Sequence, residues 1–442
     1  MSPFPDNARY VAIGDSITQS GFYLPYIDLY YITRFPQNKV KMFNAGINGD
    51  TAEGGLKRHS WDVAPHGPTV ASIAFGMNDV GRDCYAAGKD GAEVEKRRRG
   101  CLESYENNLR NLVARLQDDK VSVVLLTPTI FDNVAPVAGA HLPGLNEALA
   151  ECAQIVRKIG AETGCPVVDF YGPMLSVTEK RQAADPAFTM IGTDRVHPTQ
   201  LGQLFMAYLF LKAQNVPAEV ARVVIASATV KEASNCVVNE VKAEGGGLTF
   251  RYTAGSLPFP IEKWTSAATT WAPFVADLNQ ETLQVTDLTA GTYQLMIDDK
   301  PVRTYTSEEL AAGVNLATEE KTPQRRQAQK VWDTYKLRQE MVAKLRTIAC
   351  VERSAFAPDE PRKVTVAEME PLLEAYLHKM EGMPWQAGIE KEVQAYRLCK
   401  SDEANLLTKC DAMMDDIRKL AQPVPRVVKL VPVAAAPGTV TK

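Results

Sequence analysis

Residues 9–18 read Arg-Tyr-Val-Ala-Ile-Gly-Asp-Ser-Ile-Thr, and this stretch decides the fold class. Its apolar run predicts a buried strand over Tyr10–Gly14. The Gly-Asp-Ser turn that follows leaves the hydroxyl of Ser16 at the carboxyl end of the strand, where ligands bind in open α/β sheets. Ser16 is therefore a candidate nucleophile.

The chain from residue 9 to about 214 alternates short apolar runs with longer amphipathic ones, which is typical of a parallel α/β domain. Because helices cover both faces of such a sheet, its strands are expected to be largely apolar. The predicted strands are Tyr10–Gly14, Val40–Ala45, Thr69–Phe75, Val121–Thr127 and Pro166–Phe170. The clearest predicted helices are Glu103–Gln117, Leu145–Glu162 and Thr199–Ala213.

The second half of the chain predicts two further parts. Partly alternating segments over Thr282–Thr286 and Tyr293–Ile297 indicate a small β-rich domain. Thr322 is a suitable N-cap with Pro323 at the first helical position, so a helical hairpin or small bundle is expected from there. Further helices are predicted over Pro371–Glu381, Gln386–Leu398 and Asp402–Ala421. The expected domains are 1–216 (α/β), 217–320 (β-rich), 321–421 (helical) and 422–442 (an extended or disordered tail).

Composition narrows the possible partners. The chain has 49 basic and 53 acidic residues and a formal charge of -4, so nothing global favours binding to nucleic acid or to an anionic membrane. The basic run over residues 96–99 is expected to be a solvated face. No run approaches the roughly 18 apolar residues that span a bilayer. Residues 1–8 are too polar for a signal peptide. A signal removed ahead of residue 1 would suit an exported protein, and a cytoplasmic location stays open.

The eight cysteines form no Cys-x-x-Cys motif, so buried free thiols and local pairs (Cys152 with Cys165, or Cys399 with Cys410) are both open. Histidines 59, 66, 141 and 378 have no partners at metal-ligand spacing, and we expect surface or supporting roles and no metal. The oligomeric state is not predicted.

A base and its orienter occur together near the end of the α/β pattern, in Asp194-Arg195-Val196-His197-Pro198. A serine hydroxyl is a weak nucleophile at neutral pH and needs an adjacent base, usually with a carboxylate that fixes the tautomer of that base. In a loop, the three-residue spacing lets Asp194 contact one nitrogen of His197 while the other nitrogen faces Ser16.

Two more segments follow predicted strands and supply hydrogen-bond donors. Gly49 follows the second strand, where the absence of a side chain lets its backbone N–H approach a substrate oxygen. Asn78 follows the third strand and carries an amide. Acyl transfer needs such donors at the oxyanion, and we expect Gly49 and Asn78 to provide them.

These four blocks resemble the SGNH or GDSL hydrolases. The resemblance lies in Gly14-Asp15-Ser16-Ile17-Thr18, Asn48-Gly49-Asp50-Thr51, Gly76-x-Asn78-Asp79 and Asp194-x-x-His197-Pro198, within about residues 9–214. It implies a three-layer α/β/α fold with a five-stranded parallel sheet, and hydrolysis of carboxylic esters without a cofactor. It also implies that the backbone N–H of Ser16 joins Gly49 and Asn78 as a donor to the oxyanion. The β-rich and helical extensions resemble those of a bacterial subgroup.

The resemblance implies a serine esterase acting on short acyl groups, with acetylated carbohydrate or another small ester as the substrate. A lysophospholipase or thioesterase is the alternative among hydrolases, and it would need a long apolar groove. An alternative of another class is a non-catalytic binding or assembly protein, in which the helical region recruits a partner. The intact set of Ser16, Asp194 and His197 favours an enzyme.

Overall fold

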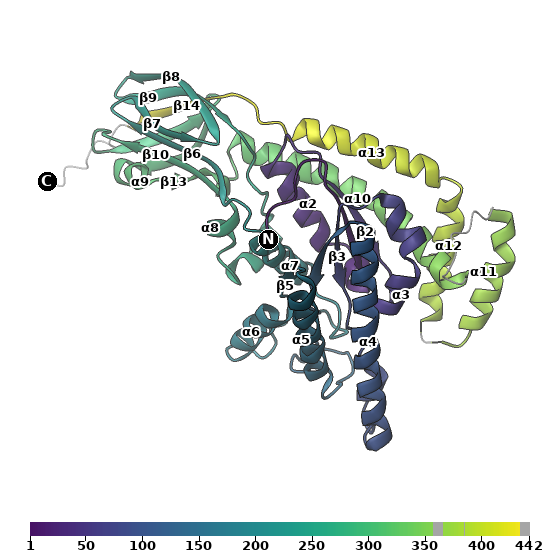
Figure 1. Cartoon of the computed structure of the whole chain (residues 1–442). Helices are drawn as coiled ribbons and strands as arrows, with labels where there is room; N and C mark the ends of the chain where they lie inside the picture. Colours follow the sequence, from purple (N-terminus) through teal and green to yellow (C-terminus); the bar gives the residue numbers. More distant parts are fainter. Residues whose placement is uncertain (357–365, 384, 434–442) are drawn as a thin grey trace. The chain divides into compact units, whose positions relative to one another are not determined.

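The computed structural model describes residues 1–356, 366–383 and 385–433 (Figure 1). The chain divides into two compact units. The first comprises Met1–Asp28, Lys39–Asn215 and Arg338–Ala412. The second comprises Leu29–Asn38, Val216–Leu337 and the described residues from Met413 onward. Three helices, α2 (Tyr23–Arg34), α10 (Pro323–Ala355) and α13 (Glu403–Leu420), contribute residues to both units.

The first unit is built on a five-stranded parallel sheet, which confirms the predicted fold class. The strand order is β2-β1-β3-β4-β5. Their bounds are β1 Arg9–Gly14, β2 Lys41–Gly46, β3 Val70–Ala74, β4 Ser122–Leu126 and β5 Val167–Val168. Gly14 is in register with Gly46 on one side and with Ala74 on the other. The segments that follow these three strands therefore begin at one edge of the sheet.

Helices cover the two faces of this sheet. They are α1 (Ser16–Gln19), α2, α3 (Ala52–Lys57), α4 (Ala92–Asp118), α5 (Leu145–Thr163), α6 (Tyr171–Gln182) and α7 (Gln200–Ala213). Because the crossovers between parallel strands are right-handed and the strand order reverses at β1, α2 lies on one face and α3 to α5 on the other. Phe210 of α7 packs against Tyr10 of β1, with ring centroids 5.8 Å apart.

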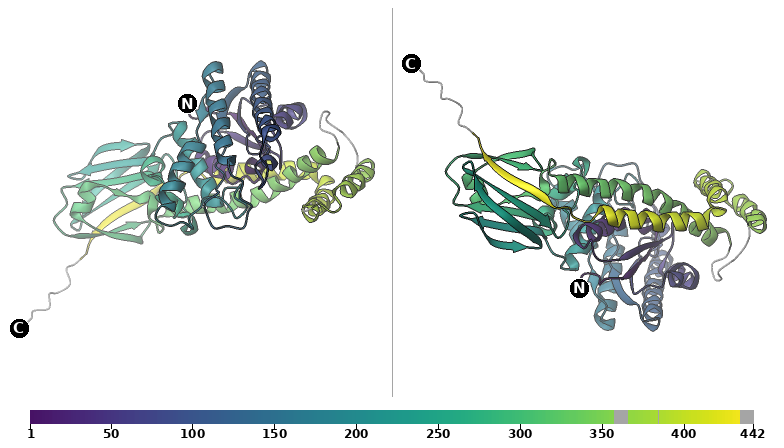
Figure 2. Two further views of the ribbon diagram at one scale, coloured as in Figure 1. Left: turned by 90° about the horizontal axis from the view of Figure 1, so that it is seen from below. Right: turned by 90° about the horizontal axis from the view of Figure 1, so that it is seen from above.

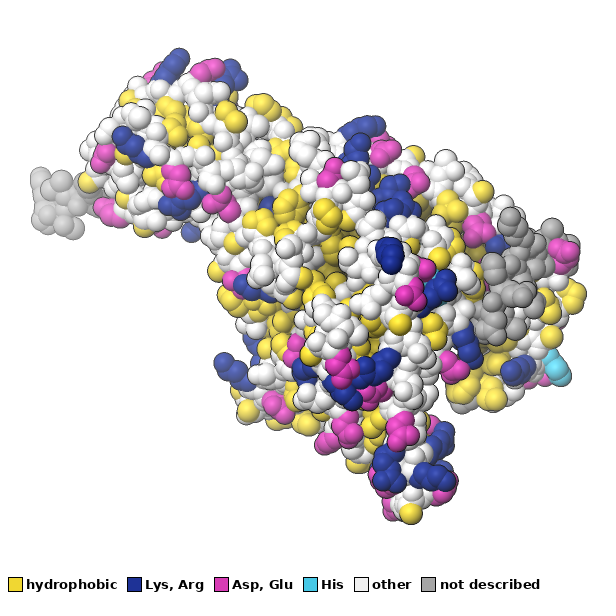
Figure 3. Space-filling view, viewed as in Figure 1, with side chains coloured by type: hydrophobic (Ala, Val, Ile, Leu, Met, Phe, Trp, Pro, Cys, Tyr) yellow, Lys and Arg dark blue, Asp and Glu magenta, His cyan; other side chains and the backbone are white. Residues whose placement is uncertain are grey.

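Helix α4 is longer than the prediction, since it begins at Ala92 and not at Glu103. Its buried residues begin only at Tyr105, so the first turns carry no apolar periodicity that could reveal them. The basic run of residues 96–99 lies in these turns and is mostly exposed, as predicted. Figure 3 shows basic and acidic side chains together on this projecting end of α4.

The second unit contains two sheets that enclose one apolar core, which includes Phe250, Leu295 and Val428. One sheet has the order β13-β10-β6-β7 and the other β12-β11-β14-β9-β8. The strands are β6 Glu219–Ala226, β7 Thr229–Ser234, β8 Cys236–Glu244, β9 Gly247–Ala254, β10 Gln280–Thr286, β11 Thr292–Ile297, β12 Lys300–Thr306, β13 Val314–Asn315 and β14 Arg426–Pro432. Short helices α8 (Phe274–Leu278) and α9 (Ser307–Ala312) belong to this unit.

Strand β14 comes from the segment that the sequence predicted to be an extended or disordered tail. It pairs with β11 and with β9 and lies inside the sheet, in yellow among the teal strands of Figure 2. Val428 and Leu430 are buried and Lys429 between them is not, which is the alternation of a half-buried strand. Residues 434–442 lie outside the described residues.

The helical region consists of α10, α11 (Val366–Met380), α12 (Gln386–Lys400) and α13. The prediction that Pro371 begins a helix was wrong, because Pro371 lies inside α11. Residues of α10, α11 and α12 share a small core in the first unit that includes Ile348, Leu373 and Tyr396. Over the residues that can be described, none of the helices combines the length and the apolar character that crossing a bilayer requires.

Candidate active site

Ser16 lies two residues after the end of β1 and opens helix α1. The Asp15 side chain accepts the N–H of Ile17 at 2.9 Å and so caps this short helix. A Cβ at Gly14 would lie 2.2 Å from Oγ1 of Thr18 and 2.9 Å from the carbonyl oxygen of Ala74. Only glycine therefore fits where the chain turns from strand to helix, and this turn positions the Ser16 hydroxyl.

The structure brings Ser16, His197 and Asp194 together in one chain of hydrogen bonds. Nε2 of His197 is 2.7 Å from Oγ of Ser16, and Nδ1 of His197 is 2.5 Å from Oδ2 of Asp194. Oδ1 of Asp194 accepts the backbone N–H groups of Val196 and His197, both at 3.0 Å. These bonds hold both side chains in one orientation relative to the loop.

Electrostatics favour an ionised Asp194. Partial burial acts to raise the pKa of this carboxyl, but the N–H groups and the imidazole that it accepts outweigh burial, so the pKa is lowered. The side chains of His197 and Asp194 are 40% and 52% exposed, respectively. A substrate can therefore reach the imidazole from solvent.

Gly49 and Asn78 lie in the loops after β2 and β3. The N–H of Asp50 donates to the carbonyl of Ile47 at 3.2 Å, which makes a turn with Gly49 at its third position. Gly49 has φ +71°, a conformation that glycine adopts without a steric penalty. Nδ2 of Asn78 donates to the carbonyl oxygen of Asp50 at 2.9 Å. This bond uses one amide hydrogen of Asn78 and ties the two loops together.

Asp79 strengthens the same connection between the loops. Its carboxylate accepts the N–H of Ala52 and the N–H of Gly76, each at 2.9 Å. Burial raises the pKa of Asp79 to about 6, although these N–H groups act in the opposite direction. Burial likewise raises the pKa of Asp15 to about 7, and the nearby carboxylates of Asp79 and Asp50 add to that rise.

Sequence reasoning missed two buried arginines beside the site. Arg195, inside the Asp-x-x-His segment, is 1% exposed and has φ +67°. Its guanidinium donates to four backbone carbonyls, those of Asp132, Ala135, Val137 and Gly139. It therefore fastens the loop after β4 to the loop that carries His197. The residues of the loop gave no signal for this contact, because all four acceptors are backbone atoms.

Arg58 is the second missed residue, and it is fully buried. Its Nε donates to Oδ2 of Asp50 at 2.7 Å, and NH2 donates to the carbonyl oxygen of Gly14 at 3.1 Å. NH1 also donates to Oδ2 of Asp62. Arg58 thus bonds both to the strand that leads to Ser16 and to the residue that follows Gly49.

The remaining candidate ligands are engaged elsewhere. His59 is buried and its Nε2 lies 3.1 Å from Asp119, which excludes the surface position and leaves the supporting one. His66 stacks on Phe43, and His378 pairs with Glu381. In the described parts of the chain, no three His, Cys, Asp or Glu side chains are grouped as a metal site would require. All eight cysteines are free thiols, so the suggested local pairs do not form.

Comparison with known proteins places the α/β part of the chain in a family. Residues 12–204 match the model of the GDSL-like Lipase/Acylhydrolase family. An acetylxylan esterase of Geobacillus stearothermophilus is 26% identical over 219 residues, which are 46% of this chain and 92% of the relative. The structure of a gut microbial diltiazem-metabolizing enzyme is similar along nearly the whole chain, with 29% identity, coverage of 98% of this chain and 99% of that one, and a TM-score of 0.89. Residues 12–204 thus form a domain of the GDSL-like Lipase/Acylhydrolase family, and the chain is a carboxylic ester hydrolase.

Proposed function

We propose that the chain is a serine esterase that removes short acyl groups, with acetylated carbohydrate as its substrate class, and that Ser16, His197 and Asp194 are its catalytic triad. The observation that carries the proposal is the pair of short contacts at His197, 2.7 Å to Oγ of Ser16 and 2.5 Å to Oδ2 of Asp194. A base between a hydroxyl and a carboxylate at these distances can activate the hydroxyl.

The mechanism follows from these contacts. Nε2 of His197 takes the proton of Ser16 as Oγ attacks the ester carbonyl, and Asp194 stabilises the imidazolium that forms. The tetrahedral intermediate collapses when the imidazolium gives this proton to the departing alcohol, which leaves the acyl group on Ser16. His197 then takes a proton from water, the hydroxide attacks the acyl group, and the returned proton restores the Ser16 hydroxyl as the acid departs.

The proposed oxyanion donors are the N–H groups of Ser16 and Gly49 and the amide of Asn78. Ser16 is the first residue of α1, so its N–H has no acceptor within the helix. Gly49 is exposed, and the bond of Asn78 to Asp50 leaves its second amide hydrogen for substrate. Preorganised donors of this kind are each worth about 10²- to 10³-fold in rate.

Two relatives support a short acyl group. The relative from Geobacillus stearothermophilus is named an acetylxylan esterase. The full-length structural relative metabolizes diltiazem, and diltiazem is itself an acetate ester.

The test compares hydrolysis of p-nitrophenyl acetate, p-nitrophenyl octanoate and acetylated xylo-oligosaccharides by the wild type, Ser16→Ala and Ser176→Ala. Ser176 is an exposed serine of α6 and serves as the matched control. We expect acetate release by the wild type and by the control, and a loss of about 10³-fold or more in Ser16→Ala with its fold preserved. Equal rates for Ser16→Ala and the wild type would exclude the triad. A preference for octanoate would exclude the short-acyl assignment.

A further inference from the structure

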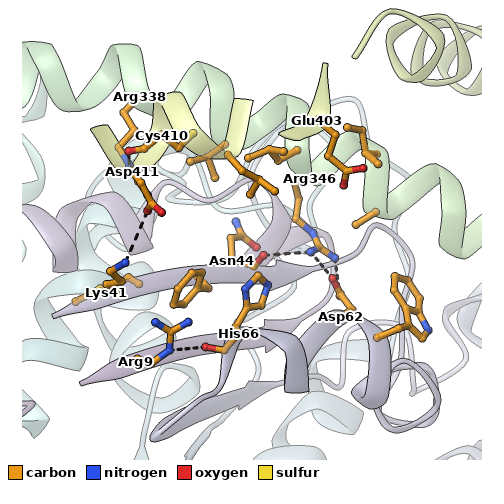
Figure 4. A pocket seen from close by; sticks show the side chains of 18 of the residues that line it. Arg9, Lys41, Asn44, Asp62, His66, Arg338, Arg346, Glu403, Cys410 and Asp411 are labelled. Atoms are coloured by element: carbon orange, nitrogen blue, oxygen red, sulfur yellow. Dashed lines mark hydrogen bonds and ion pairs between the residues drawn. The ribbon is translucent and has the colours of Figure 1, made fainter. Parts of the chain in front are cut away.

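One face of helix α10 contacts the loop that carries Gly49. Residues Arg338–Ala355 of this helix belong to the first unit, together with the sheet. Arg346, Cys350 and Arg353 are spaced four and three residues apart, so they lie on one side of the helix. Figure 4 shows Arg346 reaching from α10 toward Asn44 and Asp62, along a pocket of about 340 Å³ between β2 and the helical region.

Arg346 makes the most extensive of these contacts and is 7% exposed. Its Nε donates to the carbonyl oxygen of Gly46 at 2.7 Å, and NH1 donates to that of Asn44 at 3.2 Å. NH1 and NH2 also bind the two carboxylate oxygens of Asp62, each at 2.7 Å. The planar guanidinium is therefore paired with a carboxylate and with the end of strand β2 at the same time.

Cys350 and Arg353 contact the next part of the loop. The backbone of Asn48 interacts with the thiol of Cys350 and acts to lower its pKa, against the larger effect of burial, which raises it. NH2 of Arg353 lies 3.5 Å from Oδ1 of Asp50. Three residues of one helix face thus contact three positions of the loop. Gly46 and Asn48 precede Gly49, and Asp50 follows it.

The contacts continue from α10 to the proposed oxyanion donors. Asp62 binds Arg346 and Arg58, and Arg58 binds Asp50. The carbonyl oxygen of Asp50 in turn accepts the amide of Asn78. Asp50, Arg58, Asp62 and Arg346 are all nine-tenths or more buried. Because buried charges hold their partners in narrow geometry, the positions of Asp50 and Asn78 depend on this network.

We propose that Arg346, Cys350 and Arg353 are positioning residues that set the loop after β2, so that the Gly49 N–H and the Asn78 amide face the oxyanion. The proposal rests on the proposed function of Ser16. It gives the helical region a part in catalysis, although α10 lies outside residues 12–204. The helix acts through the loop, not on the substrate.

The test uses Arg353→Met and Arg346→Lys, with Lys344→Met as the control. Arg353 is 23% exposed at its side chain, so its replacement is expected to fold. Lysine at position 346 keeps the charge but cannot form the fork to Asp62. Lys344 is an exposed residue on the same helix, and Lys344→Met removes one positive charge, as Arg353→Met does.

We expect kcat for p-nitrophenyl acetate to fall about 10- to 100-fold in both test variants, with KM within about twofold of the wild type, because a donor displaced from the oxyanion weakens only the transition state. Labelling of Ser16 by a p-nitrophenyl phosphonate, whose phosphonyl oxygen occupies the same position, should slow in parallel. Lys344→Met should match the wild type in both measurements.

Hydrogen–deuterium exchange of the peptide over residues 46–51 separates this proposal from the assignment of Ser16. Exchange should rise in Arg353→Met and Arg346→Lys, but not in Lys344→Met, even when each also carries Ser16→Ala. Folded variants with wild-type kcat and wild-type exchange would overturn the proposal. A kcat loss that only follows the unfolded fraction, measured by circular dichroism, would also overturn it. An inactive wild type would instead refute the esterase assignment, and the exchange result would still decide whether α10 holds the loop.

Discussion

Replacing Asp194 with asparagine should damage the proposed triad more than replacing it with alanine. In the wild type, one carboxylate oxygen accepts the N–H groups of Val196 and His197, and the other lies 2.5 Å from Nδ1 of His197. In Asp194→Asn, the amide oxygen must take the two backbone N–H groups, since the opposite orientation would place NH₂ against two donors. The NH₂ group then faces Nδ1.

This orientation selects the wrong tautomer of His197. Nδ1 must become an acceptor, so the imidazole hydrogen moves to Nε2, which faces Oγ of Ser16 at 2.7 Å. The tautomer that can accept the proton of Ser16 carries its own hydrogen on Nδ1. In the variant this hydrogen would face the NH₂ group of the new amide, and an unsatisfied donor costs about 1–3 kcal/mol. Loss of the carboxylate charge costs about a further 1–4 kcal/mol, which is the interaction of two unit charges about 4 Å apart at effective dielectric constants between about 80 and 20.

Together these effects predict a loss of about 4 kcal/mol of transition-state stabilisation, or roughly 10³-fold in kcat, for Asp194→Asn. Asp194→Ala loses the charge but leaves Nδ1 free to donate to water, so it avoids the tautomer penalty. We expect Asp194→Ala to be about 5- to 100-fold more active than Asp194→Asn. Steady-state hydrolysis of p-nitrophenyl acetate measures both, with Asp185→Asn, an exposed carboxylate, as the control. An asparagine variant as active as the alanine variant would refute this account of Asp194.

Three further predictions concern stability. At Gly49 there is room for the methyl group of alanine, but φ stays at +71°, which is unfavourable for alanine. Urea denaturation of Gly49→Ala should therefore show a loss of about 1 kcal/mol in the free energy of unfolding. Unchanged stability would contradict the left-handed turn. Burial raises the pKa of Asp15 to about 7. The neutral form of Asp15 therefore contributes to the free energy of unfolding. This contribution is complete below pH 3.8 and is lost as the pH rises through 7. The free energy of unfolding of the wild type, relative to Asp15→Asn, should therefore fall by on the order of 4 kcal/mol across that window, and a constant difference would refute the shift. Arg195→Met removes the donors to four backbone carbonyls, so thermal denaturation should show a loss of about 3 kcal/mol or more, and limited proteolysis should cut the loop after β4 sooner. Resistance equal to the wild type would show that the loop holds without Arg195.

The sequence predicted the five strands of the parallel sheet because each is a short apolar run between amphipathic helices, and a buried parallel strand requires little else. Its predictions failed where local pattern was weak. The first turns of α4 have no buried face, so they carry no periodicity. Strand β14 follows a long helical region, so nothing near it in sequence indicates that β9 and β11 are its partners.

The sequence by itself determined the chemistry that is available: a serine after a strand, a histidine and an aspartate three residues apart, and donors in two turns. Only the tertiary structure decided which groups meet. The 2.7 Å contact between Ser16 and His197 joins residues 181 positions apart, and Arg346 reaches Gly46 across 300 positions. Hydrogen bonds and ion pairs act over a few ångströms, while the spacing of residues along a chain constrains only near neighbours. For this reason the participation of α10 in the site could not be deduced from any motif in the chain.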